Sequence, residues 1–377
     1  LGCVDEVFQV TAEHAGLFDV IQAVVGPRHC HDLRRMLQRI LLQPAVCQHI
    51  VAGVAEQEQR LCGRTLAQRD RDLLTGLPPD LAAEALLSGC DPESGRQLLA
   101  WPMPNWLFAR DCFALAGQSV ILGHPRHPAR QRDGLLARAI VRHHRVLRDA
   151  DHIDVAQLLP PGADAWLEGG DVLIVSKEIA LIGIGIRTSA SAAAALAGAL
   201  RQRGFSHVLG VHLPRTRAAM HLDTLFTLID EDACLLYAAA FSADSPAEER
   251  VEVVALDGSD RALGCDLPAI LGRLGRPLRA VACGDGDPVL AAREQWTDGA
   301  NAFCLGPGRI LLYARNKGTL RALNRAGFEI LHPAEFIRNA HLLMAGKRRF
   351  VVAVSGFELS RGRGGPRCLT LPVRRAR

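Results

Sequence analysis

Apolar and polar positions fall into a repeating pattern from about residue 100 onward. The clearest copy runs from Asp171 to Val211. It contains two short apolar runs, DVLIV and IALIGIGI, then a helical stretch, TSASAAAALAGALRQ, and a third run, SHVLGV. Short apolar runs bounded by turn residues are typical of buried strands, whereas apolar residues spaced three and four apart are typical of helices. The pattern predicts a strand–strand–helix–strand unit.

A second copy of this unit runs from Ala302 to Leu331. In both copies a Gly-Phe pair, Gly204–Phe205 or Gly327–Phe328, follows the helical stretch. The glycine suits the left-handed residue that commonly ends a helix. Two looser copies start in NWLFARDCFALAG and LDTLFTLIDED. Repeated ββαβ units predict an α/β protein whose modules pack around a shared axis. Neither a GxGxxG nor a P-loop fingerprint is present.

Residues 36–95 follow a different pattern. They are rich in Leu, Ala, Gln, Arg and Glu, and their apolar residues recur at helical spacing. Short turns separate three such stretches. This region therefore predicts a block of helices joined by short connections.

Composition narrows the functional classes. The 377 residues are 49% hydrophobic and 22% charged, with a net charge of +4. These values are ordinary for a globular protein and give no reason to expect nucleic acid or a membrane as partner. No apolar run approaches the ~20 residues of a membrane span, and the first residues lack the features of a secretory signal. Eleven cysteines without a C-x-x-C pair favour a reducing cytoplasm over a disulfide scaffold.

Several polar residues are candidates for chemistry. We expect the acidic residues Asp111, Glu168 and Asp171 to lie where strands end, as well as Asp223 in MHLDT. If MHLDT is a strand, His221 and Asp223 point to the same face and address one pocket. A histidine beside a carboxylate, with a distant cysteine, makes a workable nucleophile set. Taken singly, each residue is equally consistent with a turn, a helix cap or a surface ion pair.

The segment SRGRGGPRC near the C-terminus combines glycines, arginines and Cys368. Positive charge nearby is expected to lower the pKa of the thiol below ~8.5 and to make it a better nucleophile. A nucleic-acid-binding RG segment or a plain flexible loop are the alternatives, although this is one short copy without aromatic residues. If Arg130, Arg187 and Arg363 converge, they can bind a carboxylate. The spacing of His29–His31, and of His124 with His127, does not match a four-ligand zinc site.

Six motifs occur together: PMPNWLFARD, LEGGD, GIRTS, MHLDT, EQWTDGAN and SRGRGGPRC. Their order resembles that of the arginine deiminase family over nearly the whole chain. The resemblance implies a pentein fold, an α/β propeller of five ββαβ modules, with a small inserted helical domain. It divides the chain into 1–35, the remnant of an incomplete first module; 36–95, the inserted domain; and 96–377, the remaining catalytic modules.

The resemblance also implies roles for individual residues. It makes Cys368 the nucleophile, and it makes His221 and Glu168 the proton-transfer pair. The other implied roles are guanidinium binding by Asp111 and Asp223, binding of the substrate carboxylate by Arg130, Arg187 and Arg363, and lining of the substrate by Asn105 and Phe108. The implied reaction converts L-arginine to L-citrulline and ammonia without a metal or cofactor, in a cytoplasmic enzyme that assembles into a homo-oligomer.

Three departures from the family pattern keep alternatives open. The strand and substrate-contacting segment that open other members have no counterpart before a helix expected near Val4. Leu369–Leu371 and Ala314 replace residues common in the family, and residues 332–352 lengthen the approach to the cysteine. One alternative is another guanidino hydrolase or an amidinotransferase. The other is a truncated, non-catalytic homologue that binds arginine.

Overall fold

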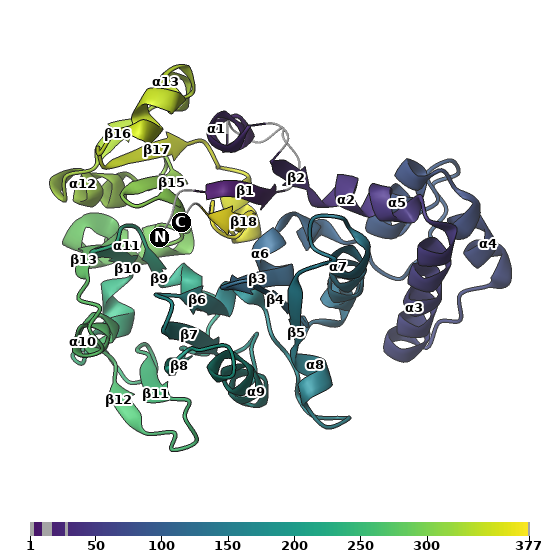
Figure 1. The fold of residues 1–377 in the computed structure, drawn as a ribbon, viewed down its shortest axis with the longest axis horizontal. Helices are drawn as coiled ribbons and strands as arrows, with labels where there is room; N and C mark the ends of the chain where they lie inside the picture. Colours follow the sequence, from purple (N-terminus) through teal and green to yellow (C-terminus); the bar gives the residue numbers. More distant parts are fainter. Residues whose placement is uncertain (1–3, 10–16, 27–28, 376–377) are drawn as a thin grey trace.

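The computed structural model describes residues 4–9, 17–26 and 29–375, and these residues form an α/β protein with several sheets. The sheets follow one another around the larger part of the molecule, on the left of Figure 1, while a group of helices extends to the right. In the described part of the chain, no helix is both long and apolar enough to cross a lipid bilayer.

Five sheets share one topology within the described residues. In each, a first and a second strand pair antiparallel, and the second strand then pairs parallel with a strand that follows a helix. The strands are β1 (Val4–Gln9), β2 (Cys30–Asp32), β3 (Phe113–Ala116), β4 (Ser119–Leu122), β5 (Asp151–Asp154), β6 (Val172–Ile174), β7 (Ile179–Ile184), β8 (His207–His212), β9 (Phe226–Leu228), β10 (Ala233–Leu236), β11 (Glu252–Ala255), β12 (Ala262–Gly264), β13 (Arg279–Ala282), β14 (Phe303–Gly306), β15 (Arg309–Tyr313), β16 (Glu329–Leu331), β17 (Phe350–Val354) and β18 (Thr370–Arg375).

The predicted unit between Asp171 and Val211 is confirmed. Strand β7 is buried along its whole length, as its uninterrupted apolar sequence requires. Helix α9 (Ala190–Arg201) begins after Ser189, whose hydroxyl accepts a hydrogen bond from the backbone N–H of Ala192. After the helix, Gly204 adopts a positive φ of 94°, and Gly327 adopts 92° in the second copy. Both glycines take the left-handed conformation that the sequence indicated.

The sheet that begins with β14 carries one extra strand. Its strand order is β14-β15-β17-β16, so β17 lies between β15 and β16, the two strands that would pair in the basic unit. Helix α13 (Pro333–Ala345) connects β16 to β17. The long approach to the cysteine, residues 332–352, is therefore an extra helix and strand added to the sheet.

Four helices form the block on the right of Figure 1. They are α2 (Leu33–Leu41), α3 (Pro44–Cys62), α4 (Gln68–Gly76) and α5 (Pro79–Ser88). Their apolar faces share one core with α7, the helix that lies between β4 and β5 in the chain. The remaining α-helices are α1 (Leu17–Val25), α6 (Ala109–Cys112), α7 (Gln131–His143), α8 (Val155–Leu158), α10 (Leu267–Arg273), α11 (Pro288–Trp296) and α12 (Lys317–Arg325).

The helix expected near Val4 is wrong. Residues Val4–Gln9 form strand β1, which pairs antiparallel with β18 and parallel with β2. The segment VDEVFQ carries β-branched and aromatic residues, and β18 offers it a backbone ladder from the other end of the chain, which local sequence reasoning could not supply. The first helix, α1, starts only at Leu17.

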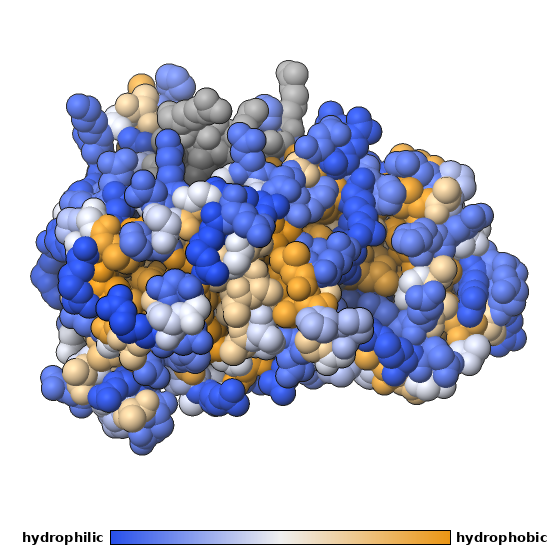
Figure 2. Space-filling model, turned by 60° about the horizontal axis from the view of Figure 1, so that its bottom comes forward, coloured by the Kyte–Doolittle hydropathy of each residue, from blue (hydrophilic) through white to orange (hydrophobic). Residues whose placement is uncertain are grey.

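Hydrophobic residues are mostly internal, but not entirely. On the face shown in Figure 2, hydrophilic residues cover most of the outline, and hydrophobic residues gather between them in the middle. A chain that is 49% hydrophobic exposes some apolar surface as a matter of course. This face alone does not define a site.

Candidate active site

The candidate residues lie in short turns that come directly before the first strand of each sheet. Asp111 is in α6, immediately ahead of β3, and Glu168 precedes β6 by a single 3-10 turn, η3 (Gly169–Asp171). Asp223 is in the 3-10 turn η4 (Leu222–Thr224) ahead of β9, and Cys368 lies two residues ahead of β18. The expectation that the acidic residues end strands is therefore wrong, because each begins a unit.

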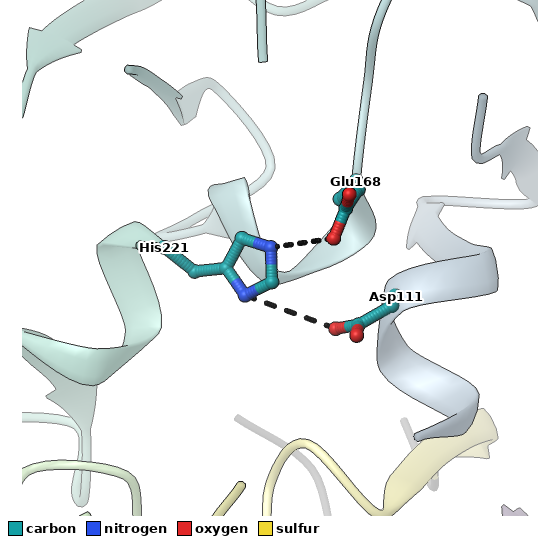
Figure 3. Close-up of side chains that lie close together, drawn as sticks. All are labelled: Asp111, Glu168 and His221. Atoms are coloured by element: carbon teal, nitrogen blue, oxygen red, sulfur yellow. Dashed lines mark hydrogen bonds and ion pairs between the residues drawn. The ribbon is translucent and has the colours of Figure 1, made fainter. Parts of the chain in front are cut away.

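Three of these residues form a buried cluster, shown in Figure 3. The Nε2 atom of His221 lies 2.9 Å from Oε2 of Glu168, and its Nδ1 atom lies 3.8 Å from Oδ1 of Asp111. All three side chains are almost completely buried. The imidazole is thus held between two carboxylates that come from two other sheets.

His221 and Asp223 do not share a strand face as expected. His221 precedes the turn η4, and Asp223 lies inside it. In a 3-10 turn, residues two apart point in different directions. His221 consequently faces Glu168 and Asp111, whereas both carboxylate oxygens of Asp223 lie 3.9 Å from the Sγ atom of Cys368.

The surroundings set the charges of the histidine–glutamate pair. Burial by itself lowers the pKa of His221, but Asp111, the hydrogen bond to Glu168 and the nearby Asp171 together raise the pKa to about 9. Burial favours the neutral form of Glu168, yet the hydrogen bond from His221 and the charge of Arg130 bring its pKa well below the usual range. The pair is therefore an imidazolium–carboxylate ion pair at neutral pH.

The thiol of Cys368 is buried and sits among acids. Burial is the main cause of a pKa well above the ordinary value, and Asp223, Asp111 and Asp298 raise it further. The expectation that nearby arginines lower this pKa is wrong. The loop arginines Arg363 and Arg367 are engaged with backbone carbonyls and with Asp223, and burial and the acids outweigh their charge. The thiol is neutral at neutral pH until another cation arrives.

Two of the three arginines expected at a substrate carboxylate contact the buried cluster instead. Arg130 donates to Asp111 at 2.6 Å and to Asp133 at 2.9 Å, and its Nη1 lies 3.5 Å from Glu168. Arg187 donates to Glu168 at 3.1 Å and remains a quarter exposed. Both cations are thus used to balance the buried carboxylates.

The third arginine, Arg363, lies apart from the other two. It adopts a positive φ of 61° and donates to the backbone carbonyls of Gln295 at 3.1 Å and Ala218 at 2.6 Å. Its guanidinium carbon stands 4.5 Å from the ring centre of Trp296. The three arginines therefore do not converge on one acceptor in this structure.

Asn105 and Phe108 border the same region. The carbonyl of Asn105 accepts from Arg130 at 3.4 Å. The ring of Phe108 packs on the cysteine loop so closely that a Cβ atom at Gly364 would lie 2.2 Å from it. Phe108 thus supports the loop through a contact that only glycine allows.

Sequence reasoning named Asp171 only as an acid near a strand end and gave no role to Arg367 or Asn301, yet these three residues hold the site together. Arg367 pairs with the carboxylate of Asp223. Asp171 accepts from the hydroxyl of Thr188 at 2.6 Å and from the backbone N–H of Leu222 at 2.9 Å. The third residue, Asn301, contacts the cysteine loop directly. The motifs LEGGD, EQWTDGAN and SRGRGGPRC contain all three, but nothing in their spacing indicated which groups these side chains touch.

One group of potential metal ligands occurs among the described residues. Asp111, Glu168 and His221 offer ligand atoms within 4.8 Å of one another. The guanidinium of Arg130 already lies between the two carboxylates, and the histidine carries a proton. A metal ligand must be deprotonated and free of such a cation, so this group does not fit a metal ion in the arrangement seen.

The buried thiol, the adjacent carboxylates and the histidine–glutamate pair define a candidate thiol-dependent catalytic site on an α/β scaffold. The chain belongs to the arginine deiminase family, whose sequence model matches residues 91–375. The four turns that hold Asp111, Glu168, Asp223 and Cys368 all lie within this range.

Individual relatives agree with this membership. The chain is 34% identical over 282 residues to the arginine deiminase of Clostridium perfringens, an alignment that covers 72% of this chain and 61% of that protein. It is 35% identical over 280 residues to the arginine deiminase of Bacillus cytotoxicus, covering 72% and 62%. The chain therefore spans about 61–62% of the length of these relatives.

Among solved structures, the chain is similar to the product-bound N-terminal domain of ArgZ, an arginine dihydrolase from the ornithine–ammonia cycle in cyanobacteria. The identity is 18% with a TM-score of 0.48, and the similarity covers 72% of this chain and 76% of that domain.

Proposed function

We propose that this chain hydrolyses L-arginine to L-citrulline and ammonia through a covalent intermediate on Cys368. The observation that carries the proposal is a buried site in which both carboxylate oxygens of Asp223 lie 3.9 Å from the Sγ atom of Cys368, while Glu168 and Asp111, from two other sheets, contact His221. The family membership over residues 91–375 supports it.

The fold that supports this function is a pentein propeller. Five sheets with one repeated topology favour it. In this assignment residues 1–35 belong to the first module, 36–95 are an inserted helical domain, and 96–377 supply the remaining modules. The free state of the ten described cysteines suits a reducing cytoplasm. Sedimentation velocity would test the homo-oligomer expected from the family.

The substrate guanidinium binds between Asp111 and Asp223. A guanidinium is a permanent cation and needs carboxylates when buried. In the present structure Arg130 occupies Asp111 and Arg367 occupies Asp223. Substrate binding therefore exchanges one internal guanidinium, or both, for the guanidinium of the ligand. Arg363 and Arg187, with Arg130 once it is released, hold the α-carboxylate, and Asn105 and Phe108 line the substrate.

The chemistry then follows from the charges in the site. The arriving cation offsets the acids around Cys368, so the thiol releases its proton to solvent, and its sulfur bonds to the guanidinium carbon. His221 donates a proton to the departing nitrogen, the C–N bond breaks, and ammonia leaves. A water molecule then gives one proton to His221 while its oxygen bonds to the carbon. The C–S bond breaks, the remaining proton of that water passes to the sulfur, and citrulline leaves with the thiol restored.

Citrulline production by the purified chain tests this proposal. Cys368→Ala should abolish turnover, because no other group can form the covalent intermediate. Cys234→Ala removes a buried cysteine from strand β10, in a different hydrophobic cluster from Cys368, and should leave the rate within about twofold since it changes only packing. Undiminished turnover in Cys368→Ala would remove the proposed nucleophile.

One alternative has a specific motivation. The pairing of both carboxylates proposed for the substrate with internal arginines motivates a homologue that binds arginine without turnover. Calorimetric titration of arginine into Cys368→Ala detects binding independently of catalysis. A panel of guanidino compounds with amine acceptors, read by mass spectrometry, separates another hydrolase or an amidinotransferase.

A further inference from the structure

The turn before strand β14 also supplies a polar side chain to the site. Asn301 lies two residues ahead of β14, just as Asp111 lies two residues ahead of β3 and Cys368 two ahead of β18. The proposed reaction gives this turn no role. Asn301 is nevertheless completely buried, so its amide needs partners on both its donor and its acceptor side.

The amide of Asn301 joins the two parts of the nucleophile side. Its Oδ1 atom accepts from the backbone N–H of Arg367 at 3.1 Å and of Cys368 at 3.2 Å. Its Nδ2 atom donates to the backbone carbonyl of Asp223 at 2.9 Å. The amide of Asn301 therefore links the backbone of Cys368 to the backbone of Asp223, the residue whose carboxylate faces the thiol.

The chain is shaped to admit this contact. A Cβ atom at Gly365 would lie 2.5 Å from Oδ1 of Asn301, so the amide reaches the loop only because residue 365 is glycine. Behind Asn301, the hydroxyl of Thr227 donates to the carbonyl of Ala300 at 2.7 Å and anchors the turn on β9. The amide thus projects from a rigid turn into a glycine-rich loop.

The loop has few other fixed points. The hydroxyl of Tyr313 donates to the carbonyl of Gly364 at 2.8 Å, and the backbone N–H of Arg110 donates to the carbonyl of Cys368 at 3.1 Å. Neither contact involves Asp223. The side chain of Arg367 does pair with Asp223, but in the proposed reaction the substrate guanidinium takes its place. A loop rich in glycine gains little order from its own backbone, so with substrate bound the position of the sulfur relative to Asp223 depends on Asn301.

We propose that Asn301 is a positioning residue that holds the sulfur of Cys368 in register with the guanidinium bound by Asp223. The inference rests on the proposed function, since register matters only if the sulfur attacks that guanidinium. Attack requires the reacting atoms about 3–3.5 Å apart, and a displacement of about 1 Å can lower the rate about 100-fold. Removal of the amide therefore lowers kcat more than it changes KM.

Asn301→Ala tests the proposal, with Asn316→Ala as the matched control. Asn316 is equally buried, and its amide also bridges a turn, through Thr297 at 3.0 Å, but it does not contact the cysteine loop. We expect Asn301→Ala to lose about 100-fold in kcat, with KM changed less than about threefold. The control should lose comparable thermal stability and retain kcat within about twofold.

Hydrogen exchange read by mass spectrometry supplies a measurement that does not depend on turnover. In Asn301→Ala the peptide spanning residues 366–371 should exchange faster, because the amides of Arg367 and Cys368 lose their acceptor, while Asn316→Ala should leave this peptide unchanged. If Asn301→Ala does not fold, Gly365→Ala tests the same contact by pushing the amide away.

The outcomes separate the two claims. If the unmodified chain makes no citrulline but the peptide loosens as expected, the proposed function fails and the contact stands. If the peptide of Asn301→Ala exchanges as in the unmodified chain, or kcat is retained, the positioning role is overturned even when citrulline is made.

Discussion

The two sides of the candidate site are held in different ways. On one side, Glu168 and His221 are fixed by a single buried acid, Asp171. The backbone N–H of Leu222, next to His221, donates to Asp171. The hydroxyl of Thr188 also donates to Asp171, and it accepts from the backbone N–H of Glu168 at 3.3 Å. This side is therefore built into the starts of two sheets.

The other side places Cys368 on a loop that contains three glycines between residues 362 and 365. Its fixed points are side chains from elsewhere, chiefly Asn301 and Tyr313, and an ion pair between its own Arg367 and Asp223. The side of Glu168 and His221, which we propose transfers protons, is therefore organised before a ligand arrives. The side of Cys368, the proposed nucleophile, instead uses a contact that the proposed substrate would replace. The lesson is that the two sides should respond differently to substitution.

The largest effect is expected on the rigid side. Glu168→Gln keeps the shape of the side chain but removes one of the charges that, with Asp111 and Asp171, raise the pKa of His221. Loss of a positioned proton-transfer group should lower kcat by about 10²–10⁴-fold. Steady-state citrulline formation measures this loss.

Hydrogen exchange supplies the control for Glu168→Gln. Because the loop is held by other residues, the peptide spanning residues 366–371 should exchange as in the unmodified chain. Faster exchange of this peptide in Glu168→Gln would show that the two sides of the site are not independent, and it would contradict the difference drawn between them.

A smaller effect is expected from the ion pair on the nucleophile side. Arg367→Met leaves the fully buried Asp223 without its cation, and removal of one partner of a buried pair typically costs about 3–5 kcal/mol. Urea denaturation should therefore show a lower free energy of unfolding. Added arginine should raise the Tm of this variant more than that of the unmodified chain, because its guanidinium can take the vacant place.

Arg361→Met is the matched control on the same loop. Arg361 is largely exposed and pairs with Glu358, which is also largely exposed, so its loss should lower stability by less than about 1 kcal/mol. Equal losses in the two variants would mean that the Arg367 pair contributes no more than a surface contact.

Sequence alone identified the elements but not the partners. The ββαβ units around Asp171 and Ala302 were predictable because buried strands and capped helices leave local patterns. The strand at Val4 was not, because β18, from the opposite end of the chain, supplies its ladder. Asp111, Glu168 and His221 were expected near one another and do meet, though from turns that begin strands.

The arginines show why the side-chain partners in the site could not be predicted from the sequence. Nothing in the neighbouring residues of Arg130 or Arg363 tells whether a guanidinium faces a ligand, an internal carboxylate or a backbone carbonyl. In the structure Arg130 pairs with Asp111, and Arg363 donates to the backbone carbonyl of Ala218. Side-chain partners far apart in sequence are set by packing of the whole fold, which a motif does not encode.

The smallest effect is a pH dependence of stability that belongs to one side of the site. The pKa of His221 is raised from 6.5 to about 9 by Asp111, Glu168 and Asp171, against the opposing effect of burial. A raised pKa stabilises the folded state fully below 6.5, and this contribution is lost as pH rises through 9. At roughly 1.4 kcal/mol per pKa unit, stability should fall by up to about 3 kcal/mol across this window.

Urea denaturation between pH 6 and pH 9.5 checks this prediction with two variants. His221→Gln removes the titrating group, so its stability should change less over the window than that of the unmodified chain. Cys368→Ala should keep the slope up to about pH 9, because burial raises the thiol pKa above 9.0 and the contribution of Cys368 is lost only as pH rises beyond 9.0. Burial raises the pKa of Asp171 from 3.8 to about 7. The contribution of Asp171 to stability is therefore lost as pH rises from 3.8 to about 7, which lies mostly below the window of pH 6 to 9.5. Parallel curves for the unmodified chain and His221→Gln would mean that the imidazole is not held as a cation, and the distinction between the two sides would lose its electrostatic basis.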